Sequence, residues 1–146
     1  MIRDSEQRPH QHLDVWRDAM ALASSVYRMS AALPDSERFG LTMQMRHAAV
    51  SAPSNIAEGA ARRSTSEYLR FLSMARGSLS ELDTQLELAT QLSFVPPEHT
   101  QHDLLNRCFS RLNALIRSIE RNLPASKSPR TAFPKSPMPN PESHDR

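Results

Sequence analysis

Apolar residues recur every three or four positions along most of the chain, and this spacing is typical of one buried face of an α-helix. Strand-like alternation is absent, and the 146 residues include only three glycines. The pattern therefore predicts an all-α protein, an antiparallel up-down four-helix bundle with short connections. The predicted helices span about residues 14–33, 39–62, 64–93 and 98–122.

The third helix carries the most regular pattern. Ser64 and Glu67 have the spacing of a capping box, with the serine as the N-cap. The apolar seam has heptad spacing and consists of Tyr68, Leu72, Ala75, Leu79, Leu82, Leu86 and Ala89. Gly77 and Ser78 at its centre would allow another helix to approach closely.

The second helix contains an interruption, because Pro53 has no N–H for the carbonyl of Ala49 and its ring crowds that turn. Two interpretations follow. Either a kinked helix continues to about Arg62, or the helix breaks and a separate short helix starts at Pro53. In both, Asn55 and Glu58 could offer polar partners to the backbone groups that the bend leaves free.

Composition divides the chain into three regions. The composition of residues 1–12 predicts a flexible N-terminus, and residues 13–123 are predicted to form the four-helix bundle. Residues 124–146 are rich in Pro and Ser, so they cannot bury enough apolar surface to offset the entropy of ordering. We therefore expect one folded domain followed by a disordered Pro-rich tail.

No membrane-spanning or secretion signal is visible in the sequence. No run approaches the roughly 20 apolar residues of a membrane-spanning helix, and the N-terminal segment lacks the apolar centre of a signal peptide. The single cysteine, Cys108, excludes an internal disulfide and falls on the apolar face of the fourth helix. These features predict a cytoplasmic protein without membrane contact, with Cys108 in the core.

Charge is distributed unevenly, although the net charge is only +2. All but two of the 18 Lys and Arg residues are Arg, whose planar guanidinium suits bidentate contact with phosphate or carboxylate. A GC-rich genome would equally produce this composition. Residues 81–106 contain five acids and no Lys or Arg, whereas residues 107–121 contain four Arg and one acid.

The first candidate phosphate-binding surface is a stripe of arginines on the fourth helix, opposite its apolar face. Such a stripe can follow a nucleic-acid backbone. The alternative is a solvated face whose arginines pair with the acidic half of the third helix. The stripe consists of Arg107, Arg111, Arg117 and Arg121.

The second candidate surface combines Arg62 and Arg63, just before the third helix, with Arg46 and Arg70. The N-terminus of a helix also favours anions, which supports phosphate binding here. The alternative is ion pairing between subunits. No aromatic residue is interleaved with these arginines, so binding would involve the nucleic-acid backbone or shape rather than stacked bases.

Signals for catalysis and metal binding are weak. Glu58 and Glu81 could lie near each other inside the bundle, but the Glu-x-x-His motif of di-metal bundles is absent. Pairing with an arginine such as Arg76 is the expected fate of these acids. His99 and His102 match no strong zinc pattern. We therefore expect no catalytic residues, no metal and no cofactor.

Several pieces of the sequence resemble a known family. They are Trp16 with Ala19-Met20 and Val26-Tyr27, the run Pro34 to Arg46, the run Ser51 to Gly59 that contains Asn55-Ile56-Ala57-Glu58-Gly59, and the run Ala75 to Leu86. Over about residues 13–122 the chain resembles four-helix-bundle proteins encoded in intervening sequences of 23S ribosomal RNA genes. One departure is His47, where the family more often has a second basic residue, so phosphate contact there would be weaker or pH-dependent.

The resemblance implies an antiparallel four-helix bundle that assembles into a ring-shaped homo-oligomer, with a pentamer as the expected state. Relatives of similar shape act as accessory proteins of diversity-generating retroelements, and they bind nucleic acid and a reverse transcriptase. A link with nucleic acid is thus suggested by analogy of fold and by gene context.

We interpret the chain as a non-enzymatic, oligomeric bundle that binds structured RNA or DNA through its arginines. A ring would multiply each basic patch and strengthen the weak field of one chain. The alternative is a homo-oligomeric scaffold that binds a protein partner, with the arginines in intersubunit ion pairs. Structural or intersubunit roles are predicted for Pro53, Asn55, Glu58, Arg76, Gly77 and Glu81.

Overall fold

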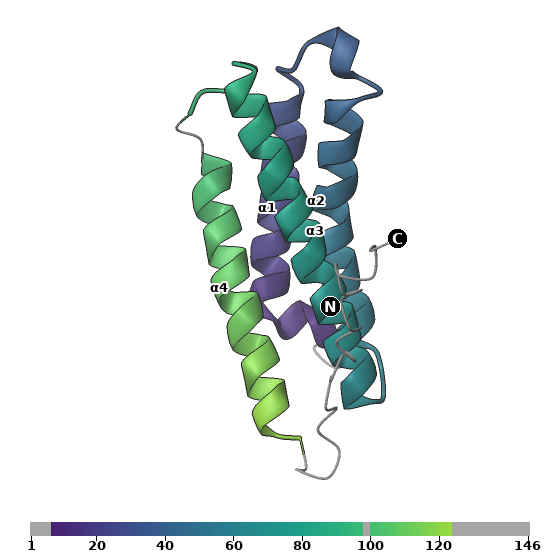
Figure 1. Ribbon diagram of the computed structural model, residues 1–146. Coiled ribbons are helices and arrows are strands. Elements are labelled where there is room, and N and C mark those ends of the chain that lie inside the picture. The colour runs from purple at the N-terminus through teal and green to yellow at the C-terminus, as the bar shows by residue number, and fades with distance from the viewer. Residues whose placement is uncertain (1–6, 98–99, 124–146) are drawn as a thin grey trace, which may run out of the picture.

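A computed structural model describes residues 7–97 and 100–123, which form an elongated bundle of four long helices (Figure 1). The predicted all-α fold with four long helices is confirmed, and consecutive helices run in opposite directions, as in an antiparallel bundle. The long helices are α1 (Asp14–Ser30), α2 (Leu41–Ala60), α3 (Thr65–Gln91) and α4 (Thr100–Arg121). Short 3-10 helices, η2 (Pro9–His12) and η3 (Asp35–Glu37), precede α1 and α2. The predicted disordered tail lies outside the described residues.

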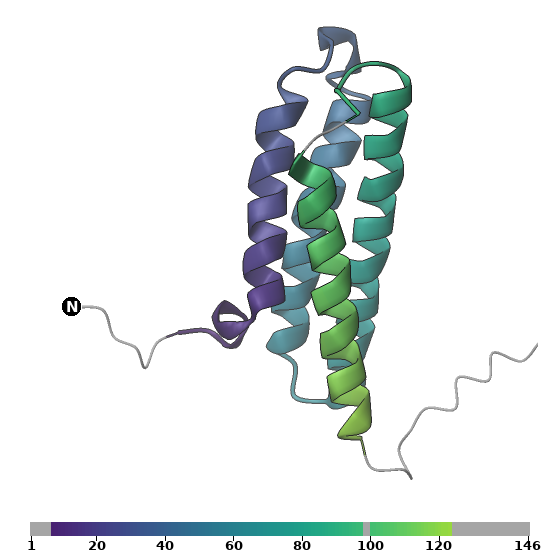
Figure 2. The same ribbon diagram turned by 90° about the vertical axis from the view of Figure 1, so that its left-hand side faces the viewer.

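Each long helix packs against two others, as around the corners of a square (Figure 2). α2 lies between α1 and α3, and α4 closes the bundle between α3 and α1. The hydroxyl oxygens of Ser51 in α2 and Ser78 in α3 are 2.8 Å apart, and the Gln101 side chain of α4 donates to Ser25 of α1. The outer side of the α1–α2 pair therefore faces away from the outer side of the α3–α4 pair.

The interior is filled by the apolar stripes that the sequence predicted. On α3, Leu72, Leu79 and Leu82 are each 0% exposed, and burial of such a side chain contributes about 2 kcal/mol. Cys108 of α4 is also buried, as predicted, and burial raises the pKa of its thiol to about 12. The thiol is therefore protonated and weakly nucleophilic at neutral pH.

α2 is continuous through Pro53, so the interpretation with a separate short helix is wrong. The helix ends at Ala60, slightly earlier than predicted. Asn55 Nδ2 donates to the backbone oxygen of Ser51 at 2.9 Å, which strengthens the turn that the proline weakens. Glu58 does not share this role, because its side chain is exposed and forms no hydrogen bond with the described residues.

Close contact between α2 and α3 depends on Gly59. A Cβ atom at this position would lie 2.9 Å from the Cβ of Phe71 and 3.3 Å from the backbone oxygen of Tyr68. Neither of these atoms can move without shifting α3, so a larger residue would push the two helices apart.

Part of the N-terminal segment assigned to residues 1–12 is helical. η2 covers Pro9–His12, and the His10 ring meets the Trp16 ring edge-on with centroids 4.8 Å apart. Arg17 Nη2 also donates to the backbone oxygen of Gln11 at 2.9 Å. Ordered structure in the described residues therefore begins before residue 13.

Candidate nucleic-acid interface

The connection between α2 and α3 carries Arg62 and Arg63 at the lower end of the bundle in Figure 1. The Arg62 guanidinium lies over the Phe71 ring, 4.6 Å from its centroid, and Arg70 lies 4.8 Å from the same centroid. Phe71 is only 5% exposed, so one buried ring positions two arginines. The sequence analysis did not predict that Phe71 positions these arginines. The feature that could have indicated it is that Phe71 is apolar but lies off the heptad seam of α3.

Ser64 caps α3 as predicted, because its Oγ accepts a hydrogen bond from the Glu67 backbone N–H at 3.1 Å. The reciprocal half of the capping box is not formed. Instead the Glu67 carboxylate pairs with Arg70, with 3.0 Å between Oε2 and Nη2. The Arg70 hydrogen bond lowers the pKa of Glu67 and the same contact raises the pKa of Arg70. Arg70 is therefore partly neutralised, unlike Arg63.

A cavity of about 240 Å³ joins this connection to the C-terminal half of α4. Its lining residues are Arg62, Arg63, Ser64, Thr65, Tyr68, Leu115 and Ile119. Burial raises the pKa of Tyr68, so its phenol stays protonated at neutral pH. Arg117 and Arg121 belong to the same turns of α4 as Leu115 and Ile119. The connection and the end of α4 thus lie at the same end of the bundle, although Arg117 and Arg121 do not line the cavity.

The four arginines of α4 differ in their surroundings. Arg111 Nη1 lies 2.7 Å from Asp18 Oδ2 of α1, and the Asp18 side chain is only 12% exposed. Arg107, Arg117 and Arg121 are exposed and form no hydrogen bond or ion pair with any residue that the structure describes. The predicted stripe therefore offers three available guanidinium groups rather than four.

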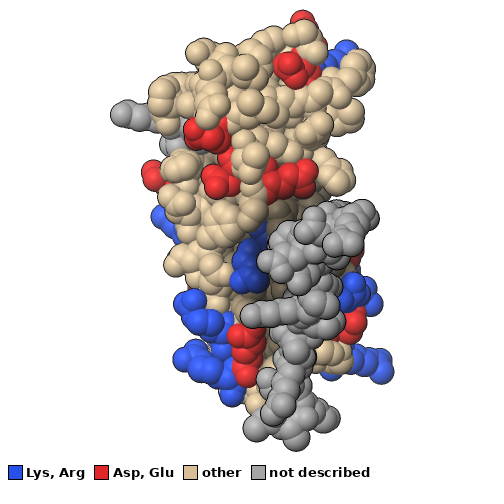
Figure 3. All heavy atoms as spheres, viewed as in Figure 1, with Lys and Arg blue, Asp and Glu red and all other residues tan. Residues whose placement is uncertain are grey.

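The alternative in which the α4 arginines pair with acids of α3 is wrong for the described part of the chain. Asp83 and Glu87 lie in the upper half of α3, beside the start of α4, whereas Arg117 and Arg121 lie at the opposite end of α4. On the face shown in Figure 3, most acidic side chains gather in the upper half and most basic ones in the lower half. The antiparallel arrangement thus separates the two charges along the bundle.

Arg46 does not belong to the second predicted surface, and its grouping with Arg62 is wrong. From Arg46 to its end at Ala60, α2 extends about 21 Å at a rise of 1.5 Å per residue, and Arg62 lies beyond that end. Arg46 Nε donates to Ser30 Oγ at 2.8 Å and Nη2 donates to the Tyr27 backbone oxygen at 3.2 Å. Its guanidinium also lies 4.8 Å from the centroid of the Tyr27 ring. Arg46 therefore closes the C-terminal end of α1.

The prediction that Glu58 and Glu81 lie near each other inside the bundle is also wrong, because both side chains are exposed. Glu81 accepts a hydrogen bond from Gln85 Nε2 at 3.3 Å. The predicted internal partner Arg76 instead donates to Asn113 Oδ1 of α4 at 3.2 Å. Helix register separates Glu58 from Glu81, so they do not form a carboxylate pair for acid–base chemistry.

The described residues, 7–97 and 100–123, offer neither a metal site nor a membrane span. They contain no group of three or more His, Cys, Asp or Glu side chains placed to hold a metal ion. His99 lies outside these ranges, so the predicted His99–His102 pair stays without a structural description. None of the helices in these ranges is long and apolar enough to cross a bilayer.

Comparison with known proteins identifies the family. Residues 11–118 match the family described as 23S rRNA-intervening sequence protein. The chain belongs to this family. The match to the intervening-sequence family includes α1, α2 and α3 and most of α4, and it ends before Arg121. No curated protein matches the chain. The family description names no ligand and no reaction.

Proposed function

We propose that this intervening-sequence protein is a non-enzymatic, oligomeric helical bundle that binds structured RNA or DNA through the phosphate backbone. The contact surface, termed the basic end, consists of Arg62, Arg63, Arg117 and Arg121, whereas the exposed Arg107 lies about 21 Å from Arg121 along α4, towards the start of that helix. One observation carries the proposal. These arginines are exposed, and none forms an ion pair with a residue of the described chain.

Arg62 stacks on the Phe71 ring, but no ion pair within the described protomer neutralises the arginines of this surface. Like charges held close together repel each other and oppose folding. A phosphate backbone would relieve this repulsion, because each guanidinium can bind phosphate through two parallel hydrogen bonds. The N-terminus of α3, next to Arg63, adds partial positive charge to the same surface.

The surroundings of the arginines favour contact with phosphates over contact with bases. Phe71 is buried beneath Arg62 and Arg70, and Tyr68 is half-buried in the neighbouring cavity. Neither ring is available as a platform on which an unpaired base could stack. We therefore expect weak sequence preference and a preference for duplex or folded nucleic acid.

The absence of catalysis is part of the proposal and is supported by two arrangements. Glu58 and Glu81 are exposed on separate parts of the bundle, so they lack the proximity that paired carboxylates need. The only cysteine, Cys108, is buried with a raised pKa and is unsuited to nucleophilic attack.

Charge reversal at the α2–α3 connection tests the proposal. Arg62→Glu combined with Arg63→Glu should weaken binding of a labelled RNA hairpin at least about tenfold in fluorescence anisotropy, because two phosphate contacts are lost. The matched control is Lys127→Glu with Lys135→Glu, which changes net charge equally at two positions outside the four helices. An equal loss of affinity in the control would reject a localised site.

A second candidate function is a homo-oligomeric scaffold for a protein partner. It is favoured by large apolar side chains exposed on the outer side of α1 and α2, among them Met20, Tyr27 and Val50. If the arginines serve intersubunit ion pairs instead, the Arg62→Glu and Arg63→Glu substitutions should dissociate the oligomer. Sedimentation velocity on the same double variant therefore distinguishes the scaffold from the nucleic-acid binder.

A further inference from the structure

The cavity between the α2–α3 connection and the end of α4 combines two kinds of lining. Its volume is about 240 Å³, which is the space of about eight water molecules at roughly 30 Å³ each. Four polar residues come from the connection and the start of α3, and three half-buried, largely apolar side chains come from α3 and α4. We term this space the connection cavity.

The polar part of the lining contains two guanidinium groups whose charge is not neutralised. Arg62 and Arg63 are exposed, and neither forms an ion pair with a residue that the structure describes. Glu58 and Glu67, the acids closest to them in sequence, do not line the cavity, and the main partner of Glu67 is Arg70. An anion in the connection cavity would therefore meet two positive charges and no carboxylate of its described lining.

The start of α3 adds unpaired N–H donors beside these arginines. The backbone N–H groups of Thr65 and Ser66 have no acceptor among the described residues, as is usual in the first turn of a helix. These groups carry the partial positive charge of the helix N-terminus. Thr65 lines the cavity, so it brings this charge next to the two guanidinium groups.

The apolar part of the lining consists of Tyr68, Leu115 and Ile119, all half-buried. The Tyr68 phenol forms no hydrogen bond with the described residues, and burial raises its pKa, so it keeps a proton that it can donate. A ligand that satisfies both parts of the lining is an anion attached to a compact carbon skeleton.

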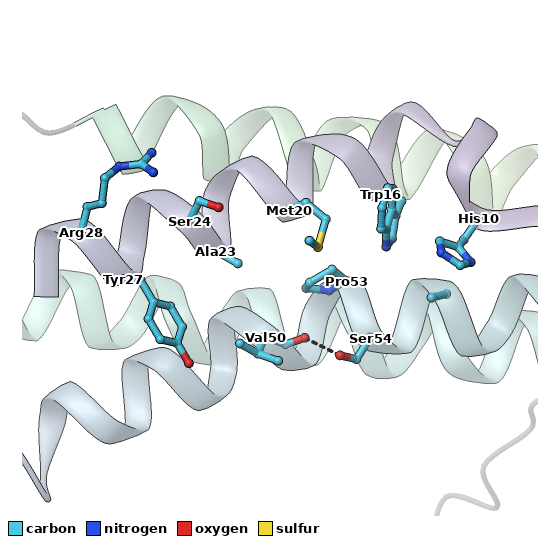
Figure 4. Close-up of a pocket in the computed structure, with 11 residues that line it drawn as sticks. His10, Trp16, Met20, Ala23, Ser24, Tyr27, Arg28, Val50, Pro53 and Ser54 are labelled. Carbon is cyan, nitrogen blue, oxygen red and sulfur yellow. Dashed lines mark hydrogen bonds between the residues drawn. The ribbon is translucent and has the colours of Figure 1, made fainter. Parts of the chain in front are cut away.

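The larger hollow on the outer side of α1 and α2 lacks this combination. It measures about 670 Å³, and Trp16 of α1 and Pro53 of α2 are directed towards the space between the helices (Figure 4). Arg28 is the one Lys or Arg among its described lining residues. In the adjoining hollow, Arg46 already donates two hydrogen bonds within the chain. The connection cavity is therefore better suited to a doubly charged anion.

We propose that the connection cavity binds a terminal phosphate monoester at the end of a nucleic-acid chain, with the edge of the last sugar against Leu115 and Ile119. This inference rests on the proposed function and specifies which part of the nucleic acid enters the cavity. A phosphate monoester carries about −1.5 to −2 charges at pH 7 and three acceptor oxygens, whereas an internal phosphodiester carries about one charge. The monoester therefore matches two guanidinium groups better. Arg117 and Arg121, outside the cavity, remain for internal phosphates of the same molecule.

RNA hairpins that differ only at their ends test the proposal. A fluorescent label is placed in the loop, and the stem carries a 5′-phosphate, a 3′-phosphate or hydroxyl groups at both ends. At least one phosphorylated hairpin should bind about tenfold more tightly than the hydroxyl-ended one in anisotropy titrations, because several charge-assisted hydrogen bonds are gained. The two phosphorylated hairpins show which end enters the cavity.

Two substitutions in the lining separate the cavity from the rest of the basic end. Tyr68→Phe removes a hydroxyl that has no partner in the described chain, and it should reduce the preference for the phosphorylated end about threefold. Leu115→Trp fills the cavity and should abolish the preference. The matched control is Arg117→Gln, outside the cavity, which should weaken binding of all hairpins alike and keep the preference. Circular dichroism checks folding, and Tyr68→Phe decides the matter if Leu115→Trp does not fold.

A free nucleoside 5′-monophosphate distinguishes the end of a chain from a small phosphate ester. It lacks internal phosphates for Arg117 and Arg121, so it should displace the labelled hairpin only at concentrations at least about a hundredfold above those of unlabelled phosphorylated hairpin. Equal potency of the two competitors would assign the cavity to a small ligand and overturn the inference.

The remaining outcomes separate this inference from the proposed function. Equal, salt-dependent affinity for phosphorylated and hydroxyl-ended hairpins would overturn the inference and leave the proposed function intact. Absence of binding by every hairpin at low salt would overturn both. A preference that persists unchanged in Tyr68→Phe and Leu115→Trp would assign recognition of the end to another surface and reject the connection cavity.

Discussion

Arginines at the two ends of the bundle have different surroundings. At the upper end, Arg46 donates hydrogen bonds to Ser30 and to the Tyr27 backbone, and it stacks on the Tyr27 ring. At the lower end, Arg63 and Arg121 are exposed without a hydrogen bond or ion pair to the described residues. The same residue type thus stabilises the fold at one end and is available for a ligand at the other. Tertiary neighbours, rather than residue type, determine which role applies.

The largest expected effect comes from removing the Phe71 ring at the lower end. This ring is buried in the bundle and also contacts Arg62 and Arg70. Phe71→Ala should reduce the free energy of unfolding by about 3–5 kcal/mol, because it leaves a cavity where α2 meets α3. Urea denaturation measures this change. Phe71→Leu is the control that retains most of the volume but loses the contacts with Arg62 and Arg70, and it should cost about 1.5 kcal/mol or less.

If Phe71 also positions the arginines, the leucine variant should bind an RNA hairpin more weakly than the wild type although it remains folded. Equal affinity of the two proteins would show that the ring supports the core alone. Arg62 and Arg63 would then bind RNA without a ring that holds them in position.

A smaller effect is expected at the upper end. Arg46→Ala removes two hydrogen bonds at the end of α1 and should lower the free energy of unfolding by about 1–2 kcal/mol. Arg46→Lys keeps the charge but not the planar fork, so it should recover only part of this stability. Affinity for RNA should stay within about twofold of wild type if the oligomer is intact. A large loss of RNA affinity would show that Arg46 belongs to the binding surface. The arginines at the two ends would then not differ in role.

The smallest expected change in stability is at Arg63. Arg63→Ala should alter the free energy of unfolding by less than about 0.5 kcal/mol, since the residue is exposed and unpaired within the described chain. It should nevertheless weaken RNA binding and reduce the slope of log K against log salt by about one. Marked destabilisation without a change in that slope would indicate a structural role instead.

Sequence periodicity was sufficient for the helices and for most of their buried faces, although Met20 and Tyr27, which fit the apolar stripe of α1, are 43% and 44% exposed. The heptad seam of α3 and the burial of Cys108 follow from spacing within a single helix, and both are confirmed. The role of Pro53 required a choice between two alternatives that depend on local packing. The structure decides it in favour of a continuous α2.

Contacts between helices were not predictable in the same way, because they depend on register. Glu58 and Glu81 were expected to meet inside the bundle, yet the antiparallel pairing of α2 and α3 leaves both exposed. Arg76 meets Asn113 for the same reason. The unpaired arginines of α4 were visible as a pattern, but only the structure places the acids of α3 at the other end.

The most direct test of the central claim is a salt titration of wild-type protein with labelled RNA hairpin and duplex DNA, followed by anisotropy. Phosphate contact through the basic end predicts saturable binding whose log K falls linearly with log salt, with a slope of about −0.9 per phosphate contacted. Absence of binding at low salt by an intact oligomer, or binding that does not change with salt, would contradict the account.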